Sequence, residues 1–304
     1  MRQYTRAGIR TAGALLAGFF LPCGALAPGR PGNTGPGDTS TLDWGGSYGQ
    51  TSDLELNGTE QGESGSLNAF ASYRLRLDTG TPVSWEVGPE FDVFTFNPSP
   101  GVFIPDRAGS MAMALVVNWR MAEKWHLSVT ARPGVYSDFT NLDLEDFNTP
   151  VLSVLTYQWN DRLTLGAALS INARNRALPL IGGVGLRWQM SERWALSLLF
   201  PRPRLEVAPN PQWRLWVGGE FKSGAYHLSE NFGTRLGAPQ LDSEFMEYRE
   251  IRAGVGAEYQ LGEHWRFRVD AGWLLDRRWD FDAVDMTYDG KGAAYGQLAV
   301  NYRF

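Results

Sequence analysis

Arginine and carboxylate side chains occupy every second position in several segments of this 304-residue chain. In residues 265–276, Arg266, Arg268 and Asp270 alternate with apolar or aromatic neighbours. Side chains at every second position share one face of an extended strand, so we expect the charged ones to face a common interior. The expected lining residues are Arg74, Arg76, Glu86, Glu90, Asp92, Arg120, Arg132, Arg174, Arg187, Arg214, Glu220, Arg252, Glu258, Arg266, Arg268, Asp270, Asp276 and Arg303.

Two interpretations of these interior charges stay open. In the first, they line an open or gated passage, because rings of charge set the ionic selectivity of a pore. Arginines outnumber carboxylates in this set, so the passage would prefer anions despite the net charge of -5. In the second, opposite charges pair and block the interior, which leaves the outer loops as the interacting part.

A hydrolase is the third interpretation, and it depends on His126, His227 and His264, which are the three histidines. We expect each beside a short turn at the same rim, with no positioned nucleophile and base. No cysteine cluster or close histidine pair suggests zinc, and the acidic loops at 138–149 and 277–292 lack the spacing of a calcium loop. We therefore expect no enzyme activity, no cofactor, and no catalytic, cofactor-binding or metal-binding residue.

The elements that position the charges are expected to be membrane-crossing β-strands. In residues 111–121, Met111, Met113 and Leu115 share one face while Ala112 and Ala114 share the other. Such runs last ten to twelve residues, near the ~9–11 that a tilted strand needs to cross a bilayer. Strands of soluble sheets average about 5–6 residues. The pattern predicts an all-β, transmembrane, antiparallel up-and-down β-barrel.

Three short charged turns are each followed by tryptophan, at Trp125, Trp194 and Trp265. Tryptophan is enriched where a membrane protein meets the lipid headgroups, and short turns alternate with longer loops in bacterial barrels. We expect short turns at 78–82, 122–124, 160–162, 191–192, 223 and 262–263. Longer loops are expected at 57–65, 96–109, 138–149, 235–247 and 277–292.

The turns divide the chain into about 14 strands, with 12 as the alternative. Both termini then lie on the periplasmic side. The expected strands are 43–56, 66–77, 83–95, 110–121, 125–137, 150–160, 162–174, 179–190, 193–206, 212–222, 224–234, 248–261, 264–276 and 293–304.

Pro201 and Pro203 interrupt one of these strands, since proline cannot donate to a sheet ladder. The favoured interpretation is that the strand leaves the membrane there. The other is a kink that turns Arg202 and Arg204 toward a constriction.

The N-terminal region has the pattern of a secretion signal, with Arg2, Arg6 and Arg10 ahead of a short apolar run. We expect a signal peptide at 1–25, a disordered Pro/Gly-rich lead-in at 26–42 and the barrel at 43–304. Cleavage would remove Cys23, which is the one cysteine, and with it any disulfide chemistry.

The segments 199–207, 216–219, 225–228 and 277–281 resemble an uncharacterised family of bacterial outer-membrane barrel proteins, known as a domain of unknown function. The resemblance covers most of the chain after residue 60 and implies a barrel fold in the outer membrane. It supplies no functional residues. The C-terminal strand, with Tyr302 and Phe304 on one face, resembles the signal that the barrel-assembly machinery recognises.

The sequence therefore predicts a channel or porin-like protein of the bacterial outer membrane for small solutes, with an arginine-rich lumen. The expected partners are outer-membrane lipids, the barrel-assembly machinery and small solutes. The mildly acidic balance argues against nucleic acid as a partner.

Overall fold

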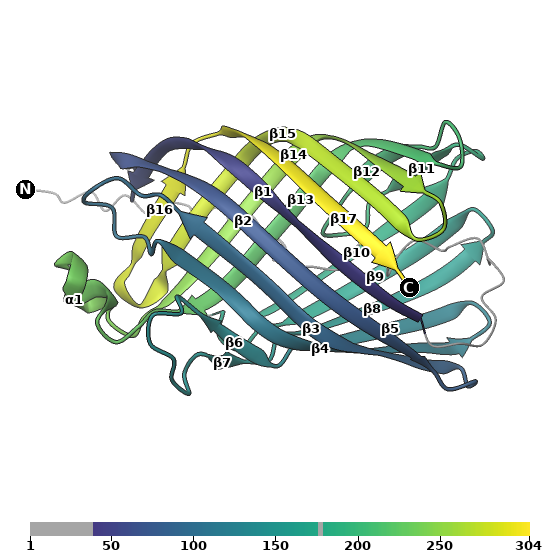
Figure 1. The fold of residues 1–304 in the computed structure, drawn as a ribbon, viewed down its shortest axis with the longest axis horizontal. Coiled ribbons are helices and arrows are strands. Elements are labelled where there is room, and N and C mark those ends of the chain that lie inside the picture. Colours follow the sequence, from purple (N-terminus) through teal and green to yellow (C-terminus); the bar gives the residue numbers. More distant parts are fainter. Residues whose placement is uncertain (1–38, 176–178) are drawn as a thin grey trace, which may run out of the picture.

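In a computed structural model that describes residues 39–175 and 179–304, the chain forms a closed antiparallel barrel of 14 strands (Figure 1). The strand segments are β1 (Thr39–Leu56), β2 (Thr59–Asp78), β3 (Val83–Phe96), β4 (Arg107–Ala122), β5 (Trp125–Ala131), β6 (Gly134–Ser137), β7 (Phe147–Asn148), β8 (Val151–Asn160), β9 (Leu163–Ile171), β10 (Leu180–Gln189), β11 (Trp194–Ser197), β12 (Arg204–Val207), β13 (Trp213–His227), β14 (Phe245–Leu261), β15 (Trp265–Phe281), β16 (Met286–Gly290) and β17 (Ala293–Arg303).

The barrel closes because β1 pairs with β2 on one side and with β17 on the other. Three barrel strands are each made of two segments: β5 with β6, β7 with β8, and β16 with β17. Pro133 and Pro150 lie at two of the breaks, since proline has no N–H to give to the ladder. The predicted fold class and the strand number of 14 are both confirmed.

Two errors in the predicted strand boundaries cancel each other, so the predicted total of 14 strands is still correct. The segment 193–206 is not one strand, because β11 and β12 are antiparallel neighbours that reverse at Pro201 and Pro203. Conversely, 212–222 and 224–234 are not two strands, because β13 continues through Ser223 and Gly224. A Cβ on Gly224 would lie 2.6 Å from the ring of Tyr226, so this glycine allows close packing and marks no turn.

The expected loop at 57–65 is also wrong, since only Asn57 and Gly58 separate β1 from β2. Both have positive φ, 49° and 87°, the backbone that a two-residue hairpin turn requires and that Asn-Gly favours. The signal peptide at 1–25 lies outside the described residues, as does the lead-in as far as residue 38. The lead-in was expected to extend to residue 42, but β1 already begins at Thr39.

The two ends of the barrel differ. The tight turns after β2, β4, β8, β10, β12 and β14 lie at the end where β17 finishes, which we call the short-turn end (Figure 1). At the other end, the loop end, lie the 97–106 and 138–146 loops and the 228–244 loop. The last of these carries α1 (Phe232–Leu236) and η1 (Pro239–Leu241), and η2 (Asp282–Val284) lies at the same end. Among the described residues, no helix is both long and apolar enough to cross a membrane.

The outer face of the barrel is apolar, as the period-two pattern predicts. On β4, Met111, Met113 and Leu115 are exposed, whereas Ala114 and Val116 are buried. Exposed tryptophans follow the short-turn end on several strands, among them Trp119, Trp125, Trp188, Trp194, Trp213 and Trp265. Aromatic partners extend this belt, as where the rings of Trp125 and Tyr157 lie 4.7 Å apart. An apolar band with an aromatic girdle is the surface that a lipid-embedded barrel presents.

A charge on this outer face should destabilise the barrel far more than the same charge inside it. Val269 is 47% exposed on β15, and Val269→Arg should cost about 2–4 kcal/mol because arginine would lie in hydrocarbon. The control is Ser128→Arg, which places arginine beside an interior cavity. Gly272 is unsuitable as a control, because a Cβ there would lie 2.1 Å from the carbonyl oxygen of Ala253.

Urea unfolding of both variants in lipid vesicles gives the comparison. Equal losses of unfolding free energy at Val269 and Ser128 would show that the inward and outward faces are wrongly assigned.

Candidate functional site

Side-chain contacts between strands that are not neighbours in the sheet identify residues that point into the barrel. Lys222 Nζ on β13 donates to Asn68 Oδ1 on β2 at 3.4 Å. Arg252 Nη2 on β14 donates to Ser47 Oγ on β1 at 3.1 Å. Neither pair of strands is adjacent, so both contacts cross the interior.

A first group of interior charges joins β2, β3 and the break between β5 and β6. Glu90 accepts hydrogen bonds from Arg74 and, at 2.8 Å, from Nε of Arg132. Both arginines are buried. One carboxylate therefore lies between two guanidinium groups that were each expected to line the interior.

A second group runs across five strands toward the short-turn end. Glu206 on β12 pairs with Arg187 on β10 at 3.2 Å and with Arg204 at 2.6 Å. Arg214 on β13 lies 3.9 Å from Glu206 and 3.3 Å from Glu258 on β14. Arg266 on β15 then lies 3.5 Å from the same Glu258. Charges of alternating sign thus form a belt along the inner wall.

A third group lies nearer the loop end and is the most deeply buried. Glu250 accepts from Arg252 Nε at 2.8 Å and from the Tyr248 hydroxyl. Arg252 also donates to Gln297 Oε1 on β17 at 3.1 Å, in addition to Ser47. This group ties β14 to β1 and β17 through the interior.

The remaining expected lining residues are distributed as follows. Glu220 pairs with Arg202, and Arg268 with Asp270. Asp276 pairs with Arg249, which alternates along β14 with the inward Glu250, so the predicted inward placement of Asp276 is wrong. A bulge between β14 and β15 at this point moves Asp276 to the outer face. Asp92 accepts from Asn68, and Glu86 accepts from Asn118 at 3.2 Å.

Four of the expected lining arginines lie outside these pairs. Arg76 and Arg120 are exposed and form no ion pair with a described residue. Arg174 lies beyond the end of β9, with its guanidinium carbon 5.1 Å from the ring centre of Phe245. Arg303 is exposed at the chain end.

Sequence reasoning missed several of these residues, chiefly Glu206, Lys222 and Glu250, and it named Arg202 only in the less favoured interpretation of a kink at Pro201 and Pro203. Arg202 and Glu206 lie around the β11–β12 reversal, where the sequence pattern predicts a single strand. Lys222 lies just before the turn wrongly expected at 223, and Glu250 was not assigned to either face. Continuing the alternation of β14 from Arg252 back to Glu250 was the available signal, since both residues fall on the same face.

The interior side chains leave cavities along the barrel, and two of them bear on a passage through it. The larger, about 810 Å³, lies toward the short-turn end and is lined by segments from β2 to β10, including Arg76, Asn118, Arg120, His126 and Arg187. A smaller space of about 100 Å³ lies further in and is lined from both sides of the barrel, by Asp43, Glu90, Arg132, Lys222 and Arg268 among others.

Beyond the smaller cavity, an apolar cluster packs together at the loop end. Phe94 and Phe96 on β3, Tyr248 on β14 and Trp279 on β15 have 2% exposure or less. The ring of Phe96 lies 4.9 Å from that of Tyr248 and 5.5 Å from that of Trp279. Val102, Ile104, Leu228, Phe232, Ala238 and Leu241, from the loops, are buried in the same cluster. We call the four ring residues, with these loop residues, the apolar plug.

The outermost surface carries a small ionic site of its own. Lys291, between β16 and β17, lies 3.5–3.6 Å from the carboxylates of Asp53, Glu55 and Glu60. These carboxylates, Glu60 first, raise the pKa of Lys291 above its ordinary value, so the ammonium stays charged at neutral pH.

The three histidines do not share one rim, contrary to the sequence-based expectation. His126 lines the larger cavity, and His264 lies at the short-turn end beside the carbonyl oxygen of Arg303. His227 lies at the opposite end of the barrel, where β13 finishes beside Ser137. The error follows from the turn wrongly placed at 223, which reversed the direction assigned to the following residues.

These features define a closed transmembrane-type β-barrel with a charged, cavity-containing interior and an apolar outer belt. Residues 49–297 match the family described as "Domain of unknown function (DUF6268)", and the chain belongs to that family. The predicted resemblance to an uncharacterised outer-membrane barrel family is confirmed. A comparison with curated proteins found no match.

Among solved structures, the fold is similar to the COG4313 outer membrane channel from Pseudomonas putida F1. The alignment covers 92% of this chain and 100% of that one, with a TM-score of 0.52 and 11% identity. The P. putida toluene transporter TodX aligns over 89% and 90% of the two chains at 11% identity, with a TM-score of 0.41. The Ralstonia pickettii toluene transporter TbuX aligns over 90% of each at 10% identity, with a TM-score of 0.40. At sequence identities of 10–11%, a structural similarity is evidence about the fold and not about the function.

Proposed function

We propose that this protein is a gated channel of the bacterial outer membrane for small polar solutes, with a weak preference for anions. The observation that carries the proposal is the cavity of about 810 Å³ inside the barrel. That volume is in the range of about 300–1,000 Å³ typical of small-molecule sites. A barrel that served only as a structural wall would gain nothing from so large a polar space.

The direction of the channel follows from the two ends. The short-turn end faces the periplasm in this proposal, since bacterial barrels have short periplasmic turns and longer outer loops. The apolar plug then separates the outside medium from the interior, and hydrophobic constrictions of this kind gate pores by excluding water. The C-terminal strand with Tyr302 and Phe304 stays our predicted signal for the barrel-assembly machinery.

The charges on the cavity walls support the anion preference. Arg76 and Arg120 line the larger cavity without an ion pair among the described residues, and Arg187, which is paired with Glu206, also lines it, against the two carboxylates Asp78 and Asp161. Local charge dominates the field in a narrow passage with low-dielectric walls. The net negative charge of the whole chain therefore does not set the selectivity.

Reversal potentials in planar bilayers under a salt gradient test this proposal. The current through brief openings of the wild-type protein should reverse at a potential that indicates anion selectivity. Arg76→Glu with Arg120→Glu should shift this reversal potential toward cation selectivity. These two arginines form no ion pair with a described residue, so replacing them breaks no ion pair in the part of the chain that the structure describes. Lys124→Glu with Arg162→Glu makes the same change of charge on short turns and serves as the control.

Cation preference in the wild type would contradict the charge argument, as would an equal shift in the control. Complete absence of current would favour the second candidate function, a permanently blocked barrel whose outer loops bind other molecules. The observation behind that candidate is the extent of ion pairing in the interior, where most buried charges have partners.

A further inference from the structure

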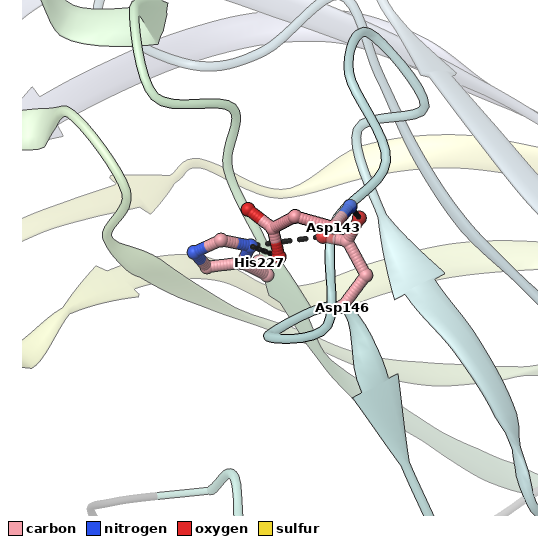
Figure 2. A group of neighbouring side chains, drawn as sticks. All are labelled: Asp143, Asp146 and His227. Atoms are coloured by element: carbon pink, nitrogen blue, oxygen red, sulfur yellow. Dashed lines mark hydrogen bonds and ion pairs between the residues drawn. The ribbon is translucent and has the colours of Figure 1, made fainter.

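His227, Asp143 and Asp146 bring three metal-ligating side chains together at the loop end (Figure 2). His227 ends β13, and the two aspartates belong to the loop between β6 and β7. His227 Nδ1 lies 2.8 Å from Asp146 Oδ1 and 3.8 Å from Asp143 Oδ1. One ligand atom from each residue lies within 4.8 Å of the others. Figure 2 shows both carboxylates directed at the same ring nitrogen.

The burial of His227 distinguishes this group from an ordinary acidic loop. Its side chain is 1% exposed, as is that of Asp146. The other ring nitrogen, Nε2, is also buried and has no hydrogen-bond partner among the described residues, although Glu145 Oε2 lies 3.4 Å away. A buried carboxylate such as that of Asp146 is costly unless a hydrogen-bond donor or a compensating charge lies beside it, and a bound cation would supply that charge.

The surrounding contacts hold these side chains in place. The backbone N–H of Asp143 donates to Asp146 Oδ2 at 2.8 Å, and that of Glu145 donates to Asp143 Oδ1 at 2.6 Å. The ring of Phe245 lies 4.9 Å from the ring of His227. The carbonyl oxygen of His227 accepts from the N–H of Asp138 at 3.1 Å. Such outer contacts orient metal ligands in known sites.

We propose that Asp143, Asp146 and His227 bind a divalent transition-metal ion, with Zn²⁺ the best match. One imidazole and two carboxylates form a mixed nitrogen and oxygen donor set, which suits zinc better than the all-oxygen set that calcium prefers. Asp143 is the most exposed of the three, so a small rotation of its side chain closes the remaining distance to a shared ion. Water would supply a further ligand.

A metal ion at this site would join two separate outer segments. The 138–146 loop would be fixed to the end of β13, and β13 continues directly into the 228–244 loop that contributes Leu228, Phe232 and Leu241 to the apolar plug. Binding would therefore stabilise the closed loop end. The site itself stands on its own geometry and does not depend on the proposed channel function.

Zinc binding to the purified full-length protein in detergent tests the proposal. After chelator treatment, calorimetric titration with Zn²⁺ and metal analysis by mass spectrometry should give one ion per chain. Asp143→Asn and His227→Gln should each weaken zinc binding by at least about 10-fold. His264→Gln, at the opposite end of the barrel, is the matched control and should bind as the wild type does. Thermal unfolding should also shift upward with Zn²⁺ in the wild type and in this control, but not in Asp143→Asn or His227→Gln.

Heat-dependent gel migration checks that each variant is folded. If His227→Gln fails to fold, the half-exposed Asp143→Asn decides the question. The proposal is overturned by less than one bound zinc in the wild type, by equal binding in Asp143→Asn, or by equal loss in His264→Gln. Each of these results would leave His227 hydrogen-bonded to Asp146 with no metal ion between them.

Discussion

Replacing Glu250 by glutamine is expected to lower the unfolding free energy of the barrel by about 3–5 kcal/mol, because it leaves buried cations without their counter-charge. Glu250 is 0% exposed, and its partner Arg252 is 2% exposed. Glutamine keeps the size of the side chain but removes the charge that Arg252 contacts at 2.8 Å. The same arginine connects β14 to Ser47 and Gln297, so its displacement would loosen three strands.

The matched control is Asp289→Asn, which makes the same chemical change in the exposed pair of Asp289 and Arg278. Their side chains are 38% and 35% exposed, and such surface pairs contribute about 0–1 kcal/mol. Urea unfolding in lipid vesicles measures both variants. A loss below about 1 kcal/mol for Glu250→Gln would mean that water or another carboxylate compensates the charge of the buried arginine.

Shortening the apolar plug is expected to raise the average current through the barrel at least about tenfold, since dewetted apolar constrictions block ions. The variant combines Phe96→Ala with Trp279→Ala. Both rings are buried, they lie 5.5 Å apart, and they come from strands on different sides of the β1–β2 hairpin. Their removal takes away the Phe96–Trp279 contact between β3 and β15.

Phe91→Ala with Trp273→Ala is the control for the plug variant. It removes one aromatic ring from each of the same two strands, β3 and β15, but on the exposed outer face. Planar-bilayer recordings should show near wild-type currents for this control. If the plug variant folds and stays as silent as the wild type, the ion-paired interior itself blocks the barrel.

The sequence was sufficient to predict the barrel because alternation is a local property. Each strand exposes its own apolar face, as Met111, Met113 and Leu115 do, whatever its partner is. Strand boundaries were less predictable at glycine and proline, because these residues occur both in turns and within strands. Gly224 resembles a turn residue but serves the packing of Tyr226, whereas Pro201 and Pro203, which do mark a reversal, were read as the end of a single strand.

The interior contacts and the plug were beyond sequence reasoning for a different reason. Phe96 and Trp279 meet only because the sheet closes on itself, and closure depends on the register of every strand between them. His227 shows how one boundary error spreads. An extra turn at 223 reversed the chain direction and placed this histidine at the wrong end, far from Asp143 and Asp146.

The gated-channel proposal requires a cavity that is closed only at the loop end. The most direct test is to measure from which side of the membrane a reagent reaches residue 128. Ser128 lines the larger cavity, and Ser128→Cys in a Cys23→Ser background provides a single thiol in the chain. A membrane-impermeant thiol reagent should label it from the short-turn side alone in the wild-type barrel, and from both sides once Phe96 and Trp279 are shortened. Equal labelling from both sides before the plug is altered, or labelling from neither side, would contradict the gated channel.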